Sequence, residues 1–434
     1  MVAQFEKRLN SPRHTNPIKV DFTPIDRKEN DGISRNLSFQ SSSDDKTQKL
    51  DEYEWLTVMG NFVDALHNFR HASRLQLPQG IGVDVEPVNN TGRKIKIALI
   101  DDGVNFRHPS FSNQLQHGKS FDSGVGTNHK VRGAPGSPVP HYSSFTTHGT
   151  FMALQIKRMC PDAYIYVFKI DVIPRGDDPP TFRAQSAADV STKETFQSMF
   201  FTDWRLQALE SVVQGDFDII SISWTIVREN DEIGTQIDRI KIALQEAANK
   251  ALVFCSAPDI GASLDTQRHY PYNFKDDSRS PIRSLFRIGA ATAKGKTLDW
   301  ADTPVDYILP GERVTMREDD QVFELDKKPE TGSSVATALA AGLAALIIDC
   351  VRLAADYNSN GRMTEERVTL LAKIGTPEGM TTAFRAINDG RTGGTLAVES
   401  FFRERAKKLE NQDISEKEKW EMIASMARLL VPGS

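Results

Sequence analysis

"TGSSVATALAAGLAAL", residues 331–346, is a run of small and aliphatic side chains that begins with a polar, flexible corner. A helix that is apolar on all sides must lie in the centre of a fold. Its first turn nevertheless holds Ser333 and Ser334, beside backbone N–H groups that have no intrahelical acceptor, at the positive end of the helix dipole. The stretch therefore predicts a buried central helix whose serines either cap it or supply a nucleophile.

Five apolar segments that precede this helix predict the strands of one sheet. Each is rich in Ile, Val or Phe, and helical segments stand between several of them, notably 193–213 and 233–250. This alternation predicts an α/β fold with three αβα layers, in which helices cover both faces of a mainly parallel sheet. Chemistry in such sheets gathers at the C-terminal ends of the strands. The predicted strands are 94–100, 163–170, 217–223, 251–257 and 285–291.

The regions that flank this alternation divide the chain further. Residues 1–50 are polar and predict a disordered segment, whereas 51–90 predict a helical linker or the remnant of an upstream domain. Residues 91–375 form the predicted α/β domain, and 376–434 a helical C-terminal extension with a capping box. The helical spacing within 51–90 is carried by Trp55, Met59, Phe62, Leu66 and Phe69.

Composition narrows the class of protein. With 39% hydrophobic and 26% charged residues, the 434-residue chain is typical of globular proteins. Its formal net charge of −5 gives no electrostatic reason to expect nucleic acid or an acidic membrane surface as a partner. Cys160, Cys255 and Cys350 lie far apart in apolar contexts, which is typical of buried thiols in a reducing compartment. The N-terminus shows no apolar signal segment, so we expect a cytoplasmic protein.

Two short motifs carry residue types that are suited to catalysis. Strand 94–100 runs into "DDG", which places Asp101 directly after an apolar segment, and "HGT" places His148 beside a glycine where a helix begins. Each motif alone also has a structural explanation, because Asp-Gly is a common turn and a histidine can cap a helix. His141 and His148 are seven residues apart, which is not the spacing of a helical ligand pair, so we predict no metal site.

Together, in the order Asp–His–Ser, "IDDG", "HGT" and "GSSVA" resemble the three sequence blocks of the subtilisin-like serine proteases. The segments "CPDAYIYVFKI" and "FDIISIS" are similar to further parts of that family, and the resemblance covers about residues 90–375. It implies a serine endopeptidase that acts on protein or peptide substrates. Ser334 would be the nucleophile, His148 the general base, and Asp101 the residue that orients His148.

The resemblance implies no cofactor for the reaction. Structural calcium ions occur among the family's members, but the resemblance maps no ligands for one here. "DYNSNGRMTEER", residues 356–367, resembles a calcium-binding EF-hand loop but ends in Arg367 where a bidentate glutamate is needed. We therefore expect a turn before the next helix at this point.

Two departures from the family pattern concern the substrate side of the site. In "APDIG", residues 257–261, Asp259 stands where the family has an asparagine that stabilises the oxyanion. An ionised carboxylate has no hydrogen to donate and repels a developing oxyanion. The predicted substrate-binding segment is Ser223, Trp224 and Thr225, where "SWT" replaces the usual "SLG" and the second and third side chains are bulkier.

Asp259 supports an alternative function, a catalytically weak or inactive domain that binds peptides or partners within a signalling protein. The intact triad favours the protease. An α/β lipase or esterase is excluded by the triad order and by the lack of a G-x-S-x-G elbow. The layout also resembles cytoplasmic proteins of filamentous fungi that join such a domain to signalling modules, so the flanking helices are the predicted contact surface for a regulatory partner.

Overall fold

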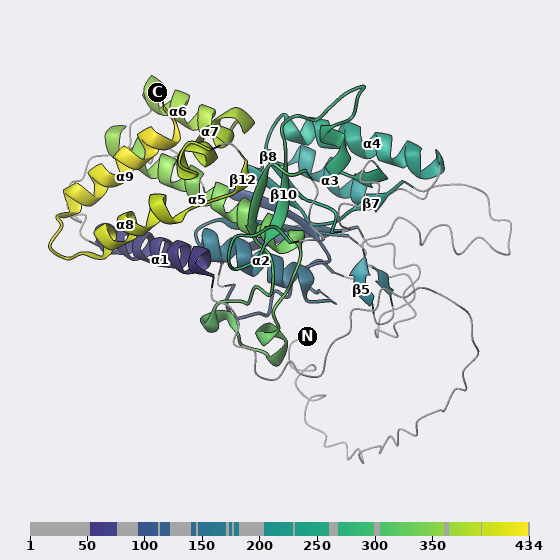
Figure 1. Cartoon of the computed structure of the whole chain (residues 1–434), viewed down its shortest axis with the longest axis horizontal. Helices are drawn as coiled ribbons and strands as arrows, with labels where there is room; N and C mark the ends of the chain where they lie inside the picture. The colour runs from purple at the N-terminus through teal and green to yellow at the C-terminus, as the bar shows by residue number, and fades with distance from the viewer. Residues whose placement is uncertain are drawn as a thin grey trace, which may run out of the picture. The chain divides into compact units, whose positions relative to one another are not determined.

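A parallel sheet of eight strands contains all five predicted strands, in the order β12-β11-β10-β8-β6-β1-β3-β2 (Figure 1). Two short antiparallel pairs, β4 with β5 and β7 with β9, lie outside it. The strands of the sheet are β1 (Lys96–Asp101), β2 (Leu115–Ser120), β3 (Tyr164–Lys169), β6 (Ile219–Ile222), β8 (Leu252–Ser256), β10 (Leu285–Ala291), β11 (Tyr307–Pro310) and β12 (Gly394–Thr395). The short pairs are β4 (Ile173–Arg175), β5 (Asp178–Thr181), β7 (Ile226–Val227) and β9 (His269–Tyr270).

The computed structural model describes residues 53–432 with gaps. The gaps are 76–93, 112, 122–139, 145, 171–172, 176–177, 182–203, 229–230, 260–267, 299–303, 360–363 and 392. The segment 1–50, predicted to be disordered, lies outside the described residues, as do 193–203 of the predicted helix 193–213.

Alternating side chains give the sheet two buried faces. In β1, Ile97 and Leu99 belong to one hydrophobic cluster, whereas Ala98 and Ile100 belong to the other. The first cluster is shared with α1, α2 and α5, and the second with α3 and α4. Because successive side chains of a strand point to opposite faces, these clusters form two layers of packing, which confirms the three-layer αβα fold.

Nine helices are found among the described residues, and most cover one face or the other of the sheet (Figure 1). They are α1 (Glu54–Leu75), α2 (His148–Met159), α3 (Trp204–Gln214), α4 (Asp231–Ala248), α5 (Ser333–Ser359), α6 (Glu365–Ile374), α7 (Pro377–Ile387), α8 (Glu399–Glu410) and α9 (Glu416–Leu430). The predicted helix 233–250 corresponds to α4, and the predicted capping box is present at the start of α9.

Helix α5 is the central helix that its sequence predicts. Every residue from Val335 to Ile348 is buried. By length and composition α5 could cross a membrane, but 89% of its most apolar window is buried inside the molecule, as in the core helix of a folded domain. Its small residues allow close packing on α2, because a Cβ at Gly342 would lie only 2.7 Å from Met159 Cβ. The two helices that carry His148 and Ser334 therefore cross at short range.

The amphipathic pattern predicted within 51–90 is confirmed in α1, whose apolar face is buried in the same core as the sheet. Phe62 packs edge-on against Phe402 of α8, with 4.8 Å between ring centroids. The Tyr53 hydroxyl donates to the carbonyl of Ala291 at 3.0 Å and accepts from the N–H of Glu312 at 2.9 Å. This apolar face is therefore covered by the chain itself.

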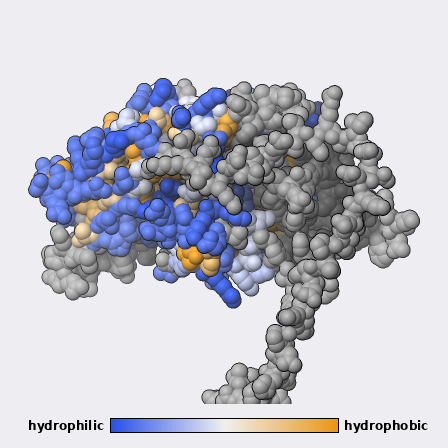
Figure 2. Space-filling model, turned by 60° about the horizontal axis from the view of Figure 1, so that its bottom comes forward, coloured by the Kyte–Doolittle hydropathy of each residue, from blue (hydrophilic) through white to orange (hydrophobic). Residues whose placement is uncertain are grey.

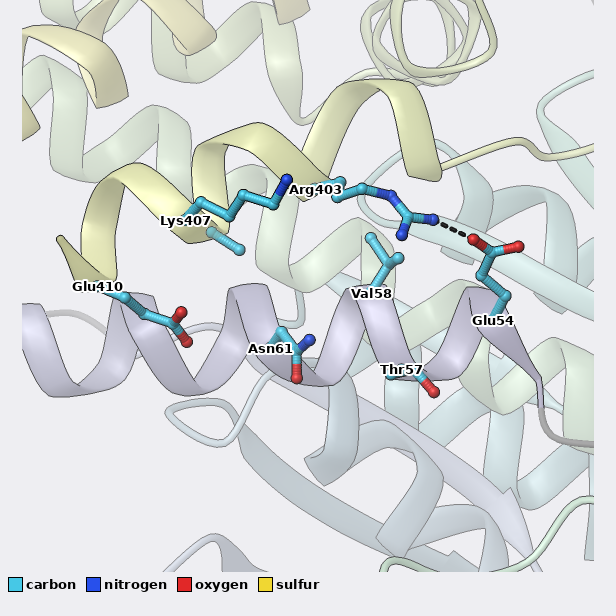
Figure 3. A pocket seen from close by; sticks show the side chains of 8 residues that line it. Glu54, Thr57, Val58, Asn61, Arg403, Lys407 and Glu410 are labelled. Carbon is cyan, nitrogen blue, oxygen red and sulfur yellow. Dashed lines mark hydrogen bonds and ion pairs between the residues drawn. The ribbon is translucent and has the colours of Figure 1, made fainter.

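A groove of about 330 Å³ lies between α1 and α8 (Figure 3). An ion pair between Arg403 and Glu54 spans it near the start of α1. The groove includes no residue of the predicted triad, so the chemistry has to be sought elsewhere. Its walls are formed by Glu54, Thr57, Val58, Asn61, Arg403, Ala406, Lys407 and Glu410.

On the face shown in Figure 2, the described residues are mostly hydrophilic, and hydrophobic residues form small separate spots. Val322 and Phe323 are the only sequence neighbours among the large hydrophobic side chains exposed in the described part of the chain. We therefore infer no apolar docking face there. The exposed set is Tyr142, Ile242, Val322, Phe323, Val368 and Leu429.

Candidate active site

Asp101 is the last residue of β1, at the C-terminal edge where an α/β sheet gathers its chemistry. Its carboxylate is fully buried, and Oδ1 lies 2.8 Å from Nδ1 of His148 and 2.8 Å from the N–H of Asp102. The second oxygen, Oδ2, has no hydrogen-bond partner among the described residues. Because an ionised carboxylate only accepts, Nδ1 of His148 carries a hydrogen, and Nε2 is the nitrogen left to face a substrate.

His148 opens α2 and keeps 18% of its side chain exposed. The residue before it, Thr147, has a left-handed backbone with φ of 66°, which is costly for a β-branched residue and typical of functional sites. Burial by itself lowers the pKa of His148. The nearby charges, with Asp101 the strongest and hydrogen-bonded as well, outweigh burial and raise the pKa to about 9.

Asp102, the second aspartate of "DDG", holds the loop that presents His148, and sequence analysis missed this role. Asp102 is 1% exposed. Its carboxylate accepts hydrogen bonds from the Gly149 N–H at 2.7 Å, from the Thr146 N–H at 3.1 Å and hydroxyl at 2.6 Å, and from the Ser144 hydroxyl at 2.8 Å. Each of two successive buried carboxylates needs its own hydrogen-bond donors. The pair of aspartates in "DDG" could therefore have indicated from the sequence that Asp102 also has a structural role.

Replacing Asp102 by asparagine should lower kcat by about 10- to 100-fold. The amide NH2 would face the N–H and hydroxyl donors that now bond the carboxylate, and the start of α2, which these bonds hold, would shift. The pKa of His148 read from the pH dependence of kcat should fall as well, because a neighbouring negative charge is removed. Steady-state kinetics across pH would measure both, with Asp216→Asn as a surface control. Unchanged kcat and an unchanged pH midpoint would refute the positioning role.

In the first turn of α5, Ser333 and Ser334 differ in burial, which the sequence alone did not reveal. Ser333 is fully buried, whereas Ser334 is half-buried and reaches the space beside Gly332. Gly332 has a φ of +156°, and a Cβ there would lie 3.1 Å from Ser334 Oγ and 3.2 Å from Asp259 Oδ2. Ser334 and Asp259 therefore border one small space, and a side chain at position 332 would fill it.

Asp259 follows β8 and binds the start of α5. Its carboxylate accepts the hydroxyl of Ser333 at 2.6 Å and the N–H of Ser333 at 2.9 Å, which caps the helix from a distant segment. Burial of the carboxyl group raises the pKa of Asp259 to about 6, against the effect of these two bonds, although the residue as a whole remains exposed. Above that pH it has no hydrogen to donate.

The segment that leads into α5 carries Glu330. Burial raises the pKa of Glu330 and the charge of His148 lowers it, while Glu330 is one of the charges that raise the pKa of His148. The backbone of Glu330 pairs with Val314, and that of Gly332 donates to Gly311 at 2.8 Å. The structure thus pairs Asp101 with His148 where β1 ends and α2 begins, and it brings Ser334 and Asp259 to one space at the first turn of α5.

The predicted substrate-binding residues follow the end of β6 and differ in what they offer a ligand. Trp224 is 1% exposed and belongs to the hydrophobic cluster under α3 and α4, so its side chain gives a substrate no surface in this structure. Ser223 is 6% exposed, and Thr225 is half-buried. The residue type and the strand end do not reveal that the indole of Trp224 turns inward to the core, and a role of Trp224 in substrate binding stays a prediction.

The described residues contain no cluster of three or more His, Cys, Asp or Glu side chains suited to a metal ion. In the segment that resembles an EF-hand loop, Asp356 belongs to α5, and its carboxylate pairs with the buried guanidinium of Arg367. The side chain at the twelfth position therefore neutralises the residue that would be the first ligand.

The model of the subtilase family matches residues 92–356, more than half of the chain. The chain is similar to the major intracellular serine protease of Bacillus subtilis (strain 168), with 22% identity over 287 residues, which span 63% of this chain and 75% of that protein.

Similar solved structures include a lanthipeptide protease, with 17% identity, a TM-score of 0.45, and coverage of 82% of this chain and 96% of that chain. The epidermin leader peptide processing serine protease from Staphylococcus aureus has 16% identity and a TM-score of 0.45, and the match covers 83% of this chain and 82% of that chain.

Proposed function

Because the chain belongs to the subtilase family and is a serine-type endopeptidase, we propose that it hydrolyses peptide bonds through Asp101, His148 and Ser334. The observation that carries this proposal is the 2.8 Å contact between Asp101 and Nδ1 of His148, at the C-terminal edge of the sheet. It orients the ring of His148 with Nδ1 toward the buried Asp101, so that Nε2 is the base nitrogen.

In the proposed reaction, Ser334 Oγ attacks the carbonyl carbon of the scissile peptide bond while Nε2 of His148 takes its proton. The tetrahedral intermediate collapses when His148 gives that proton to the leaving amine, and the C–N bond breaks. A water molecule then attacks the carbonyl carbon of the acyl-enzyme while His148 takes its proton. His148 returns that proton to Ser334 Oγ as the C–O bond breaks, and Ser334 is released. Asp101 stabilises the imidazolium that forms in both halves without taking its proton.

The developing oxyanion meets an incomplete set of donors. The Ser334 N–H lies in the first turn of α5 and has no intrahelical acceptor, so it is free to donate to this oxygen. Asp259 stands where the second donor is expected, and its ionised carboxylate is instead an acceptor for Ser333. We infer an enzyme whose oxyanion stabilisation is weak above pH 6.

The same observation supports the alternative function, a peptide-binding domain with little or no activity. A carboxylate at the oxyanion position opposes the acyl-transfer step and leaves the binding of peptides possible. We favour the protease, because a binding domain has no physical need for the buried pair of Asp101 and His148.

We also propose a cytoplasmic location and peptide or protein substrates. All three cysteines are buried free thiols, which is typical of a reducing compartment, and burial raises their pKa so that they stay unreactive. The similarity to an intracellular protease supports the same location.

A fluorophosphonate probe, which reacts with an activated serine, tests the proposal directly. Labelling should vanish in Ser334→Ala and persist in Ser359→Ala, a serine at the other end of α5. Only neutral His148 can accept the serine proton, so the labelling rate should rise about tenfold per pH unit and level off near pH 9.

Labelling that survives in Ser334→Ala would overturn the assignment of the nucleophile. If the wild type fails to label at pH 9 and fails to cleave an unfolded protein, but still binds peptides, the alternative function is the correct one.

A further inference from the structure

The backbone position of Ser334 depends on segment 311–314, because that segment is hydrogen-bonded along its length to residues 330–332. Residue 332 comes directly before α5, so these bonds fix where the first turn of the helix begins. The two segments are in close contact, because a Cβ at Gly311 would lie 2.9 Å from the carbonyl oxygen of Gly332. The bonds run from the Gly332 N–H to the Gly311 carbonyl at 2.8 Å, from the Arg313 N–H to the Thr331 hydroxyl at 2.8 Å, and in both directions between the backbones of Val314 and Glu330 at 2.8 and 2.9 Å.

Segment 311–314 contains a corner that its own residues do not favour. Arg313 has a left-handed backbone with φ of 50°, which is uncommon and costly for a residue that carries a Cβ. Such a conformation persists only where the surrounding structure holds it in place. The Thr331 hydroxyl holds one side of this corner through the N–H of Arg313, and the other side is held from a distant part of the chain.

The hydroxyl of Tyr53 holds that other side, although Tyr53 lies upstream of the region that matches the family. It accepts the N–H of Glu312 at 2.9 Å, and its hydrogen is directed to the carbonyl oxygens of Glu312 at 2.6 Å and of Ala291 at 3.0 Å. Tyr53 is buried, and burial raises its pKa to about 12, so the hydroxyl keeps its hydrogen. One side chain thus bonds both polar backbone groups of the residue before Arg313 and joins them to the end of β10.

We propose that Tyr53 is a positioning residue for the nucleophile. Through segment 311–314 it fixes the first turn of α5, and with it the place of Ser334 Oγ relative to the carbonyl carbon of the substrate. This inference rests on the proposed protease function. A small displacement of a nucleophile slows the chemical step, so loss of the Tyr53 hydroxyl should lower kcat by about three- to tenfold and change KM by less than about twofold.

The test compares the wild type with Tyr53→Phe, which keeps the ring and removes only the hydroxyl. Labelling with the fluorophosphonate probe gives two quantities, the rate constant and the fraction of molecules that finally label. The positioning role predicts a rate constant that is lower by about three- to tenfold and an unchanged fraction. A lower fraction with an unchanged rate constant would mean that the hydroxyl only keeps the protein folded, and the inference would be wrong.

Trp55→Phe is the matched control from the same end of α1. The Nε1–H of Trp55 donates to the carbonyl of Leu396 at 2.8 Å, and both residues are buried. This substitution therefore also removes a buried hydrogen bond between an aromatic side chain and the backbone, but one that does not involve segment 311–314. Its rate constant for labelling should equal that of the wild type, and an equal loss in both variants would contradict a specific role of Tyr53.

A second variant tests the same corner from the side of the nucleophile. Thr331→Val removes the oxygen that accepts the Arg313 N–H, and because Thr331 is exposed the protein should fold normally. It should slow labelling in the same way as Tyr53→Phe.

Wild-type rate constants and wild-type kcat in Tyr53→Phe would overturn the inference and leave the protease function standing. If the wild type itself neither labels nor cleaves, the protease function has failed.

Discussion

The maximal kcat of Asp101→Asn should be lower than that of the wild type by about 10⁴-fold. Asp101 Oδ1 faces two donors, Nδ1 of His148 and the N–H of Asp102, so the amide oxygen should keep that position. The amide NH2 then replaces Oδ2, which is buried without a partner. The negative charge that stabilises the imidazolium is lost, which is the main cause of the lower rate.

The pH profile distinguishes this cause from a general loss of structure. Because Asp101 raises the pKa of His148, the pH at which kcat reaches half its plateau should move down from about 9 in Asp101→Asn. Plateau kcat, the pH midpoint and thermal unfolding should be measured together, beside Asp102→Asn, where a smaller loss is expected. A loss of less than tenfold with an unmoved midpoint would contradict the assigned role of Asp101.

Asp259→Asn should raise kcat by about 10²-fold, the opposite direction to most active-site substitutions. With the amide oxygen at the Oδ1 position, where it still accepts the Ser333 hydroxyl, the amide NH2 takes the Oδ2 position beside Ser334. It gives up the bond with the Ser333 N–H and gives the oxyanion the second donor that the wild type lacks. Asp259→Ala is the matched control, because it removes the charge without supplying a donor. If both variants gain equally, the effect is relief of repulsion, and if neither gains, another donor already serves the oxyanion.

The wild type has no pH at which both groups are in their best protonation state. His148 must be neutral, which needs a pH above about 9, whereas Asp259 can donate only below about 6. Between pH 6 and pH 9, the fraction of molecules in which His148 is neutral and Asp259 is protonated stays near one in a thousand, because the two pKa values differ by about three. Kinetics of the wild type and Asp259→Asn across pH 6 to 10 would show the gain most clearly at pH 9.

The substitution Asp259→Asn should not lower the stability of the folded protein. The pKa of Asp259 is raised above its usual value, so the stability that the group contributes is present at low pH and lost as the pH rises toward about 6. A neutral asparagine removes that loss. The midpoint of thermal unfolding at pH 8 should therefore be no lower in Asp259→Asn than in the wild type.

The pairing of Asp101 with His148 and the three layers could be predicted because they depend on short-range patterns. Apolar strands, a glycine beside His148 and small residues after Ser334 are visible within a few positions of each residue. Strand β2 escaped prediction, because "LQHGKS" is an edge strand with little apolar alternation. β12 has only two residues and pairs through its backbone alone.

The contacts around the triad could not be predicted because they join distant parts of the chain. Ser333 and Asp259 are 74 positions apart, and nothing near either residue indicates that one would cap the other. The direction of the Trp224 side chain depends on space left under α3 and α4, which no local pattern reveals. The donors around Asp102 come from a loop more than forty positions away.

The hydroxyl of Tyr53 has a practical consequence for anyone who trims this chain for expression. The region that matches the family begins at residue 92, yet Tyr53 is bonded to the backbone of Glu312, next to Gly311, which in turn holds Gly332. Cutting at the family boundary would remove α1 and uncover the apolar surface beneath it. The folded core of this protein therefore extends on its N-terminal side beyond the region that matches the family, and Tyr53 is the first of the described residues that packs into it.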